Sequence, residues 1–325
     1  MSSAIAAHSS VLLLRGGTVI DGTGAPRFAA DVRIEGERIV EVGADLAQGG
    51  ADVLDAGGRI VAPGFIDVHT HDDQIVLSEP HMLPKISQGV TTVIVGNCGI
   101  SLAPLVHANV PPPLNLLGGP NKYVYPTMAA YVAAVDAARP AVNVVALVGH
   151  STLRVATMDD PYRPATAAEQ SRMCELLREG LAAGATGLSS GVFYATGAAA
   201  DVDELALLAA ITGAAGGVYT THIRQEMDKV LDSLDEAFAT ARRGEVPLVV
   251  SHHKCAGPRN WGRTIETLAH FDAARRKQAI GLDCYPYIAG STVLRSDMVD
   301  GIIDILITWS TPHPEMAART LASIA

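Results

Sequence analysis

GFIDVHTHDD, at residues 64–73, reads as a short buried strand that ends in two histidines separated by one residue. In a strand, residues i and i+2 point to the same side. His69 and His71 therefore project together from the carboxyl end of the predicted strand. Two imidazoles that converge on one point can hold a divalent metal. Two surface histidines at a strand end are the alternative for this spacing taken alone.

Beyond this stretch, the chain alternates between predicted strands and helix-like segments. The predicted strands are 65–69, 92–95, 142–148, 187–190, 217–221, 248–251 and 280–284. Helix-like segments such as 165–183 and 227–243 lie between them. This alternation predicts an α/β fold with a parallel sheet, and seven strands indicate a (β/α)₈ TIM-type metallo-dependent hydrolase barrel that lacks its last β/α unit. A doubly wound open sheet would place a glycine-rich phosphate turn after the first strand, where this chain has HTH.

Residues 1–62 show a different pattern, with short strands and tight turns. Segments 31–34 and 38–42 flank Glu-Gly-Glu, which is typical of a hairpin, and 12–22 predicts a strand, a turn and a second strand. We therefore expect a small N-terminal β-sandwich domain over residues 1–62 and the barrel over residues 63–325. The proline- and glycine-rich segment 101–128 is expected to be a long irregular loop that covers the site.

The composition argues against several classes of function. The formal net charge of −10 over 325 residues argues against a nucleic-acid surface, which needs clustered Lys and Arg. Four cysteines are too few for a disulfide scaffold. No signal-peptide pattern is present, and no run approaches the ~20 apolar residues of a membrane helix. We expect a soluble cytoplasmic protein that binds a small molecule; its oligomeric state is not indicated.

Polar residues follow five further predicted strands, within the sequences GNCG (96–99), GHS (149–151), THIR (221–224), SHHK (251–254) and DCYPY (283–287). In (β/α)₈ enzymes the site lies at the carboxyl ends of the strands. A lone buried histidine is usually a core residue. Polar residues at the carboxyl ends of five strands, all on the same side of the barrel, are hard to explain by packing. Cys98 is either a small hydrophobic residue or a thiolate ligand, and its place between Asn97 and Gly99 favours the ligand.

Six longer motifs carry a family resemblance. They are GFIDVHTHDD (64–73), GVTTVIVGNCGIS (89–101), GATGLSSGVFY (184–194), THIRQE (221–226), SHHKC (251–255) and LDCYPYIAGST (282–292). With these motifs the chain resembles the N-acyl-D-amino acid deacylases (D-aminoacylases) of the amidohydrolase superfamily. The resemblance implies zinc-dependent hydrolysis of an amide bond, which releases a carboxylate and a free D-amino acid.

The resemblance also implies roles for individual residues. The positions that match a tightly held zinc site are Cys98, His222 and His252. The positions that match a second, weaker metal site are His69 and His71, with Cys98 able to bridge. The positions that match substrate-binding residues are Lys254, Tyr285 and Ser291, and Tyr194 is a further candidate. A zinc site with one Cys and two His leaves a coordination position open for water.

One catalytic role is left unfilled by the resemblance. In the family, a general-base Asp follows the eighth strand, whereas this chain reaches Ala325 before any predicted eighth strand. Ser296-Asp297 resembles that motif, but too little chain separates it from the seventh strand for a helix between them. We therefore expect a fragment that has no catalytic base within the chain and that is inactive, or nearly so, by itself.

The substrate side chain and the alternative functions are predicted from weaker signals. Segment 305–315 resembles family members that take acidic D-amino acids such as D-glutamate. Arg295 could pair with a side-chain carboxylate, or it could be a solvated surface residue. The alternatives to a deacylase are a cyclic amidase of the dihydroorotase or hydantoinase type and a non-catalytic remnant of the barrel.

Overall fold

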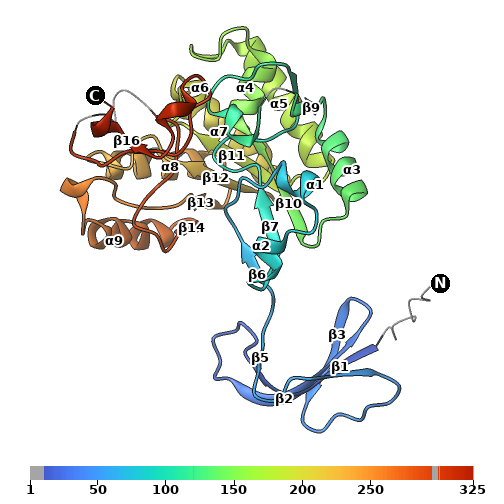
Figure 1. Cartoon of the computed structure of the whole chain (residues 1–325). Helices are drawn as coiled ribbons and strands as arrows, with labels where there is room; N and C mark the ends of the chain where they lie inside the picture. The colour runs from blue at the N-terminus through green and yellow to red at the C-terminus, as the bar shows by residue number, and fades with distance from the viewer. Residues whose placement is uncertain (1–10, 120, 295–298, 300, 325) are drawn as a thin grey trace. The chain divides into compact units, whose positions relative to one another are not determined.

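The computed structural model describes residues 11–119, 121–294, 299 and 301–324 (Figure 1). The chain divides into two compact units, Met1–Phe65 and Ile66–Ala325. The first is built from a small β-sheet, and the second from a curled parallel sheet with helices around it. The predicted fold class, a TIM-type sheet with a separate N-terminal sheet domain, is confirmed.

The smaller unit is a five-stranded sheet in the order β3-β2-β1-β4, with β5 also paired to β1. Its strands are β1 (Val11–Val19), β2 (Phe28–Glu35), β3 (Arg38–Gly43), β4 (Asp52–Asp55) and β5 (Ile60–Val61). The predicted hairpin is the antiparallel β2–β3 pair. The prediction of two strands within 12–22 was wrong, because β1 is one strand whose register shifts between Leu14 and Gly17. Gly16, with φ of 73°, absorbs this bulge.

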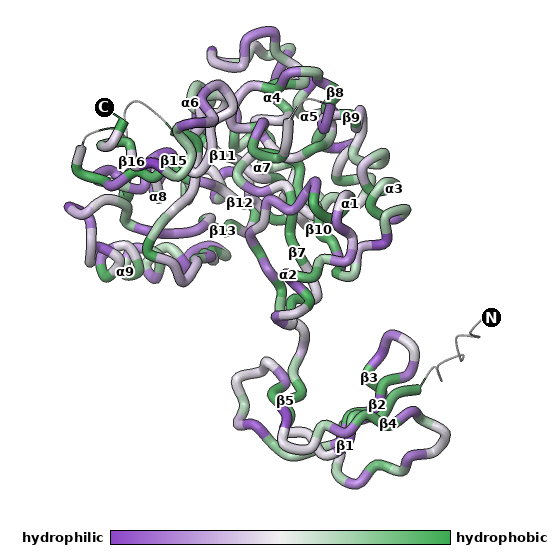
Figure 2. Tube along the Cα trace, viewed as in Figure 1, coloured by the Kyte–Doolittle hydropathy of each residue, from purple (hydrophilic) through white to green (hydrophobic). Residues whose placement is uncertain are grey.

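The main sheet of the larger unit has seven strands in the order β14-β13-β12-β11-β10-β7-β6. They are β6 (Phe65–Asp67), β7 (Val90–Val95), β10 (Asn143–Gly149), β11 (Gly187–Gly191), β12 (Val218–His222), β13 (Leu248–Val250) and β14 (Ile280–Leu282). Neighbouring strands from β7 to β14 pair in parallel. Their apolar residues form the core, and Figure 2 shows hydrophobic residues along β7 and β10. Such continuous apolar runs are typical of strands buried on both faces.

Helices follow the strands of this sheet. They are α1 (Ile75–Ser78), α2 (Leu83–Ile86), α3 (Met128–Ala138), α4 (His150–Thr157), α5 (Ala167–Ala182), α6 (Ala195–Ala198), α7 (Val202–Ala214), α8 (Val230–Arg243) and α9 (Thr264–Arg275). A capping box formed by Thr166 and Glu169 stabilises the first turn of α5. Helix α8 buries Val230, Leu234 and Phe238 at helical spacing. None of the helices in the described part of the chain is long and apolar enough to cross a membrane.

The segment predicted as a long irregular loop is more ordered than expected. It contains β8 (Leu105–His107), the 3₁₀ turn η1 (Leu114–Leu117) and β9 (Tyr123–Tyr125), and β8 pairs with β9 in an antiparallel ribbon. Its apolar residues Leu114, Leu117 and Tyr123 are buried and join the main core of the larger unit, and the Tyr123 hydroxyl donates to Leu114 O at 2.5 Å. The remaining short elements are η2 (Pro258–Asn260), β15 (Leu306–Ile307), η4 (Pro314–Met316), β16 (Arg319–Thr320) and η5 (Leu321–Ser323).

Candidate metal centre

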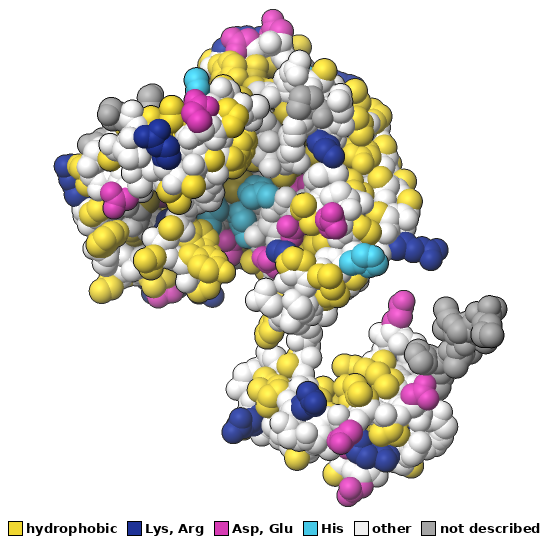
Figure 3. Space-filling model, viewed as in Figure 1, with side chains coloured by type: hydrophobic (Ala, Val, Ile, Leu, Met, Phe, Trp, Pro, Cys, Tyr) yellow, Lys and Arg dark blue, Asp and Glu magenta, His cyan; other side chains and the backbone are white. Residues whose placement is uncertain are grey.

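Side chains from four strand ends meet at one place in the larger unit. The structure forms two groups whose ligand atoms lie within 4.8 Å of one another. One group is His69, His71 and Cys98, and the other is Cys98, His222 and His252. Figure 3 shows histidine side chains inside a hollow on one face of this unit, with acidic side chains beside them. Cys98 belongs to both groups and therefore joins them.

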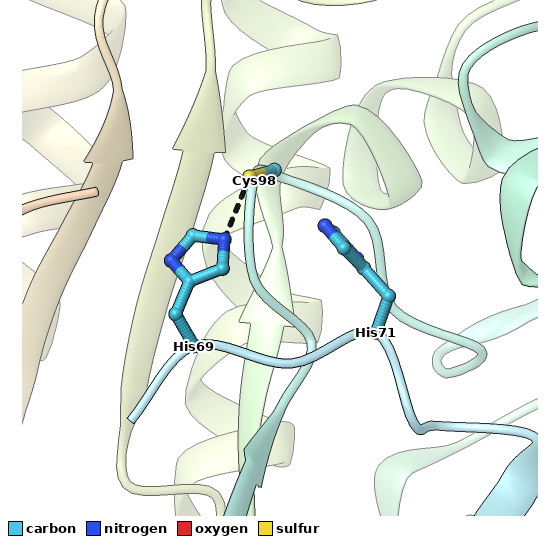
Figure 4. Close-up of side chains that lie close together, drawn as sticks. All are labelled: His69, His71 and Cys98. Atoms are coloured by element: carbon cyan, nitrogen blue, oxygen red, sulfur yellow. Dashed lines mark hydrogen bonds between the residues drawn. The ribbon is translucent and has the colours of Figure 1, made fainter. Parts of the chain in front are cut away.

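The two histidines after β6 lie on the same side of their segment, as the alternation predicted. Figure 4 shows both rings below Cys98, with His69 Nε2 at 3.2 Å from Cys98 Sγ. Thr70, between them, points the other way, where its backbone N–H and its hydroxyl both donate to Ile94 O, at 3.1 and 2.8 Å. These two hydrogen bonds to β7 fix the segment, so the two imidazoles are held toward Cys98.

The loop that carries Cys98 is packed tightly against the neighbouring strands. Gly96, Cys98 and Gly99 all have positive φ, at 80°, 56° and 78°. A Cβ at Gly96 would lie 2.2 Å from Leu147 O on β10, so only glycine fits there. Left-handed backbone is costly for Cys98 and persists only where the surroundings enforce it, which is common at functional sites. The loop thus pays a conformational cost that places Cys98 Sγ among the histidines.

His222 and His252 come from the ends of β12 and β13. Their ring centroids are 4.3 Å apart, and His252 Nε2 lies 3.4 Å from Cys98 Sγ. His222 sits between Phe193 and Tyr194, at ring-centroid distances of 4.7 and 5.0 Å. His252 has φ of 36°, so a second member of the group has strained backbone.

Burial favours the neutral imidazole in His71, His222 and His252, because it lowers the pKa of each. Burial lowers the pKa of His222 well below its usual range. The pKa of His71 is lowered to about 3 by desolvation and by the charges of His69 and His252. Burial also raises the pKa of the Cys98 thiol, and a bound cation would reverse this because a coordinating thiol is deprotonated.

These residues fit a divalent cation. Both ring nitrogens of His222 are buried and lack a hydrogen-bond partner among the described residues. Such orphaned polar atoms are costly, and a metal ligand role would satisfy one of them. A neutral imidazole offers a lone pair, and the combination of one thiolate with imidazoles is the donor set that zinc prefers.

Two carboxylates to which the sequence analysis assigned no role, Glu226 and Asp283, form hydrogen bonds or ion pairs with the histidines of this group. Glu226 Oε1 is 3.0 Å from His252 Nδ1 and 2.6 Å from Lys254 Nζ. Asp283 Oδ2 is 3.4 Å from His69 Nδ1, and Asp283 Oδ1 accepts from the His252 backbone N–H at 2.6 Å. Asp283 follows β14 directly, so its strand-end position was an available signal. Glu226 lies in the loop after β12, where no spacing marks it.

The charge state of Glu226 is set by its neighbours. Burial alone would raise the pKa of Glu226, but the hydrogen bond from His252 and the positive charge of Lys254 outweigh burial and lower the pKa to about 2. Glu226 is therefore ionised over the whole working range of an enzyme. It neutralises the positive charge of Lys254 beside the histidines.

The predicted substrate-binding residues are only partly brought together. Lys254 Nζ lies near the metal group and 5.6 Å from the centre of the Tyr285 ring, and the buried Tyr194 contacts His222. Ser291 is exposed, in the segment that follows Tyr285. Arg295 and the Ser296-Asp297 pair lie outside the described residues.

One predicted strand ending does not join the group. His150 begins α4 immediately after β10 and is fully buried. Its Nε2 lies 2.8 Å from Glu204 Oε1, and Arg154 Nη1 lies 2.5 Å from the same oxygen. The expectation that all strand endings converge on the rim was therefore wrong for the third strand, because α4 and α7 take this histidine into their own interface.

Comparisons with known proteins give a consistent result. The model of the Amidohydrolase family matches residues 52–283. D-aminoacylase from Alcaligenes xylosoxydans xylosoxydans is 47% identical over 315 residues, which cover 97% of this chain and 65% of that protein. N-acyl-D-glutamate deacylase from the same organism is 49% identical over 317 residues, which cover 97% of this chain and 64% of that protein.

A solved structure agrees with these relatives. It is the N-acyl-D-glutamate deacylase from Bordetella bronchiseptica, complexed with zinc and a phosphonate inhibitor that mimics the tetrahedral intermediate of the reaction. The TM-score is 0.90 at 46% identity, over 97% of this chain and 66% of that one. The chain therefore spans slightly less than two thirds of the length of each relative.

Proposed function

Since this chain belongs to the amidohydrolase family, we propose that its metal centre hydrolyses N-acyl-D-amino acids to a carboxylate and a free D-amino acid. The observation that carries the proposal is the group of Cys98, His222 and His252, whose ligand atoms lie within 4.8 Å of one another. Identities of 47% and 49% to a D-aminoacylase and an N-acyl-D-glutamate deacylase support the choice of substrate class.

The proposed metal is zinc. We assign one tight site to Cys98, His222 and His252 and a second, weaker site to His69 and His71, with Cys98 shared. When bound, the cation supplies a Lewis acid that polarises the amide carbonyl and lowers the pKa of a water ligand to about 7. The zinc in the Bordetella bronchiseptica relative supports this choice of metal.

The chain's own residues would orient the substrate. Lys254 offers an ammonium at the edge of the histidine group, and it suits the free carboxylate of an N-acyl-amino acid. Tyr285 lies beside it, and Tyr194 with Phe193 forms an apolar wall around His222. Such a wall excludes water and strengthens electrostatic contacts within the site. Ser291 and Arg295 remain proposed contacts for the substrate.

The reaction also needs a base that takes a proton from water and passes it to the leaving nitrogen. Neither newly found carboxylate suits this role, because Glu226 is bonded to His252 and Lys254, and Asp283 is bonded to the His252 backbone and faces His69. We therefore assign both to positioning and leave the base to another group.

The test is an assay of the full-length gene product, loaded with zinc, on N-acetyl-D-glutamate, N-acetyl-D-leucine, N-acetyl-L-glutamate and a hydantoin. Release of free D-amino acid, lost on treatment with a chelator and in Cys98→Ala, is the expected result. Turnover of the ring alone would contradict the proposal in favour of a cyclic amidase. No turnover of any substrate would indicate a non-catalytic protein.

The same assay addresses the side chain of the substrate. We propose a preference for acidic D-amino acids, supported by the similarity to N-acyl-D-glutamate deacylase. A higher rate on N-acetyl-D-leucine than on N-acetyl-D-glutamate would contradict it.

A cytoplasmic location also remains a prediction, which cell fractionation with an antibody against the chain can test.

A further inference from the structure

We propose that Glu226 is a positioning residue that joins the metal centre to the substrate-binding cation. One of its carboxylate oxygens, Oε1, holds the imidazole of His252 and the ammonium of Lys254 together. The inference rests on the proposed function for the roles of His252 as ligand and Lys254 as substrate cation. The contacts themselves are features of this structure.

The first step is the orientation of His252. Its two ring nitrogens face different partners: Nδ1 lies 3.0 Å from Glu226 Oε1, and Nε2 lies 3.4 Å from Cys98 Sγ. An ionised carboxylate can only accept, so Nδ1 carries the proton and donates it to Glu226. The lone pair is then on Nε2, which faces the metal group. Carboxylate partners of this kind fix the tautomer and the ring direction of histidine ligands.

The second step is the state of Lys254. Its Nζ donates to Glu226 Oε1 at 2.6 Å and to His252 O at 2.9 Å. Nζ also lies 3.0 Å from His252 Nδ1. Because Nδ1 carries a proton, Lys254 Nζ and His252 Nδ1 are both donors, and they share Glu226 Oε1 as their acceptor. An ammonium has three N–H groups. Two are therefore committed, and the third is the one that can receive a substrate carboxylate.

The third step is the rigidity of Glu226 itself. Its backbone carbonyl accepts from the Ala256 N–H at 2.7 Å, which ties the loop after β12 to the loop after β13. The adjacent Gln225 N–H donates to Ser233 Oγ on α8 at 3.0 Å. The side chain is only 11% exposed. Glu226 is thus held from both its main chain and its side chain, as a positioning residue needs to be.

The experiment compares Glu226→Ala, Glu226→Gln and Lys254→Met in the full chain, and uses Glu236→Gln as the matched control. Glu236 also pairs its carboxylate with a cation of the loop after β12, Arg224, at 2.6 Å, but it has no contact with the histidine group among the described residues. Zinc affinity is measured by competition with a chelator. The spectrum of the cobalt(II)-loaded protein reports the geometry around the thiolate.

We expect Glu226→Ala to weaken zinc binding about tenfold or more and to change the cobalt spectrum, because loss of such partners typically costs 10–100-fold in metal affinity. Glu226→Gln keeps an oxygen that can accept from Nδ1–H and is expected to recover part of the loss. Lys254→Met and Glu236→Gln are expected to bind zinc within about twofold of the parent, since neither removes the acceptor of His252.

Two results would overturn the inference. One is zinc affinity in both Glu226 variants within twofold of the parent, and the other is an equal loss in Glu236→Gln. If Glu226→Ala does not fold, the comparison of Glu226→Gln with Glu236→Gln decides the outcome. The metal measurements need no substrate. A chain that binds zinc as expected but fails the deacylase assay would therefore contradict the proposed function and leave this inference intact.

Discussion

At the scale of single residues, Cys98 occupies a tightly constrained position in the larger unit. It is almost fully buried, its backbone is left-handed, and its Sγ belongs to both groups of potential ligands. A buried cysteine that only fills space needs none of these features. Cys174 is such a residue, since it lies in the apolar core on α5. The two cysteines therefore offer a direct comparison of ligand and packing roles.

Cys98→Ala is expected to reduce the zinc content from about one tightly held ion per chain to under about 0.1, because it removes the one thiolate that both groups share. Elemental analysis of dialysed protein measures the loss. Cys174→Ala, the matched control, should retain its zinc. Full zinc in dialysed Cys98→Ala would show that the thiolate is not a ligand.

A second residue-scale effect concerns Glu204, which bonds to both His150 and Arg154 in the buried interface of α4 and α7. Burial alone would raise its pKa, but the hydrogen bonds and charges of His150 and Arg154 outweigh burial and lower it from 4.5 to about 2. A carboxyl whose pKa is lower in the folded state stabilises the fold above the pKa of the unfolded chain. That stability is lost as the pH falls from about 4.5 through about 2.

We expect Glu204 to contribute about 3 kcal/mol to the stability that the protein loses between pH 5 and pH 2. Glu204→Gln should show a smaller loss over this range. At pH 7 it should be destabilised by about 3–5 kcal/mol, because Arg154 is left as a buried, uncompensated charge. Urea unfolding at several pH values measures both effects. The control is Glu175→Gln, an exposed partner of Arg172, which should change stability by less than about 0.5 kcal/mol.

At the scale of elements, the loop from Gly96 to Gly99 packs against neighbouring strands of the sheet, and these contacts set the position of Cys98. It leaves β7, passes against β10 and reaches β11, where Gly99 N–H donates to Ser189 Oγ at 2.9 Å. A Cβ at Gly99 would lie 2.8 Å from Gly191 N. The loop and the two strands are thus in direct backbone contact, so a small displacement of the loop would move Cys98.

Gly96→Ala should therefore affect stability and metal binding together. The added Cβ would lie 2.2 Å from Leu147 O, and φ of 80° is unfavourable for alanine. We expect a loss of more than about 2 kcal/mol in unfolding free energy and weaker zinc binding, measured by denaturation and by chelator competition. Gly119→Ala has no atom within 4 Å of the added Cβ and should be nearly neutral. Parent-like zinc affinity in Gly96→Ala would contradict the link from loop to site.

At the scale of the whole molecule, the curled sheet has two edges in the described part of the chain, β6 and β14. His69 and Asp283, which follow these two strands, approach to 3.4 Å, so the curl brings the two ends of the sheet toward each other at the site. Apolar residues near β6 are nevertheless exposed: Ile66 at 59%, Val68 at 43% and Leu83 at 65%. Exposed apolar edge strands are templates for pairing with other chains.

Ile66→Lys is expected to reduce self-association, because a charge on an edge strand opposes strand pairing. Burial of one isoleucine side chain contributes about 1.5–3 kcal/mol to an intermolecular contact. Its loss should therefore raise the dissociation constant about tenfold or more. Light scattering over a range of protein concentrations measures this. Leu207→Lys, at an exposed position of α7, is the control and should have little effect. An equal effect of both variants would indicate a general charge effect rather than an edge.

The sequence by itself determined the elements of the fold and the set of potential ligands. Alternation in 64–73 placed His69 and His71 on one side, and the succession of strands and helices predicted the parallel sheet, which the structure confirms. The family resemblance implied Cys98, His222 and His252 as one group, and the structure brings their ligand atoms within 4.8 Å of one another. The parallel sheet could be predicted because strand alternation and strand ends are local properties of the chain.

Only the tertiary structure decided which polar groups support that set. Glu226 reaches His252 and Lys254 across two loops, and Asp283 reaches His69 because the sheet curls. His150, which sits at a strand end like the others, is taken instead by Glu204. Hydrogen bonds act over about 3 Å, so partner choice depends on the packing of loops and on sheet curvature. Neither is encoded in the spacing of residues along the chain.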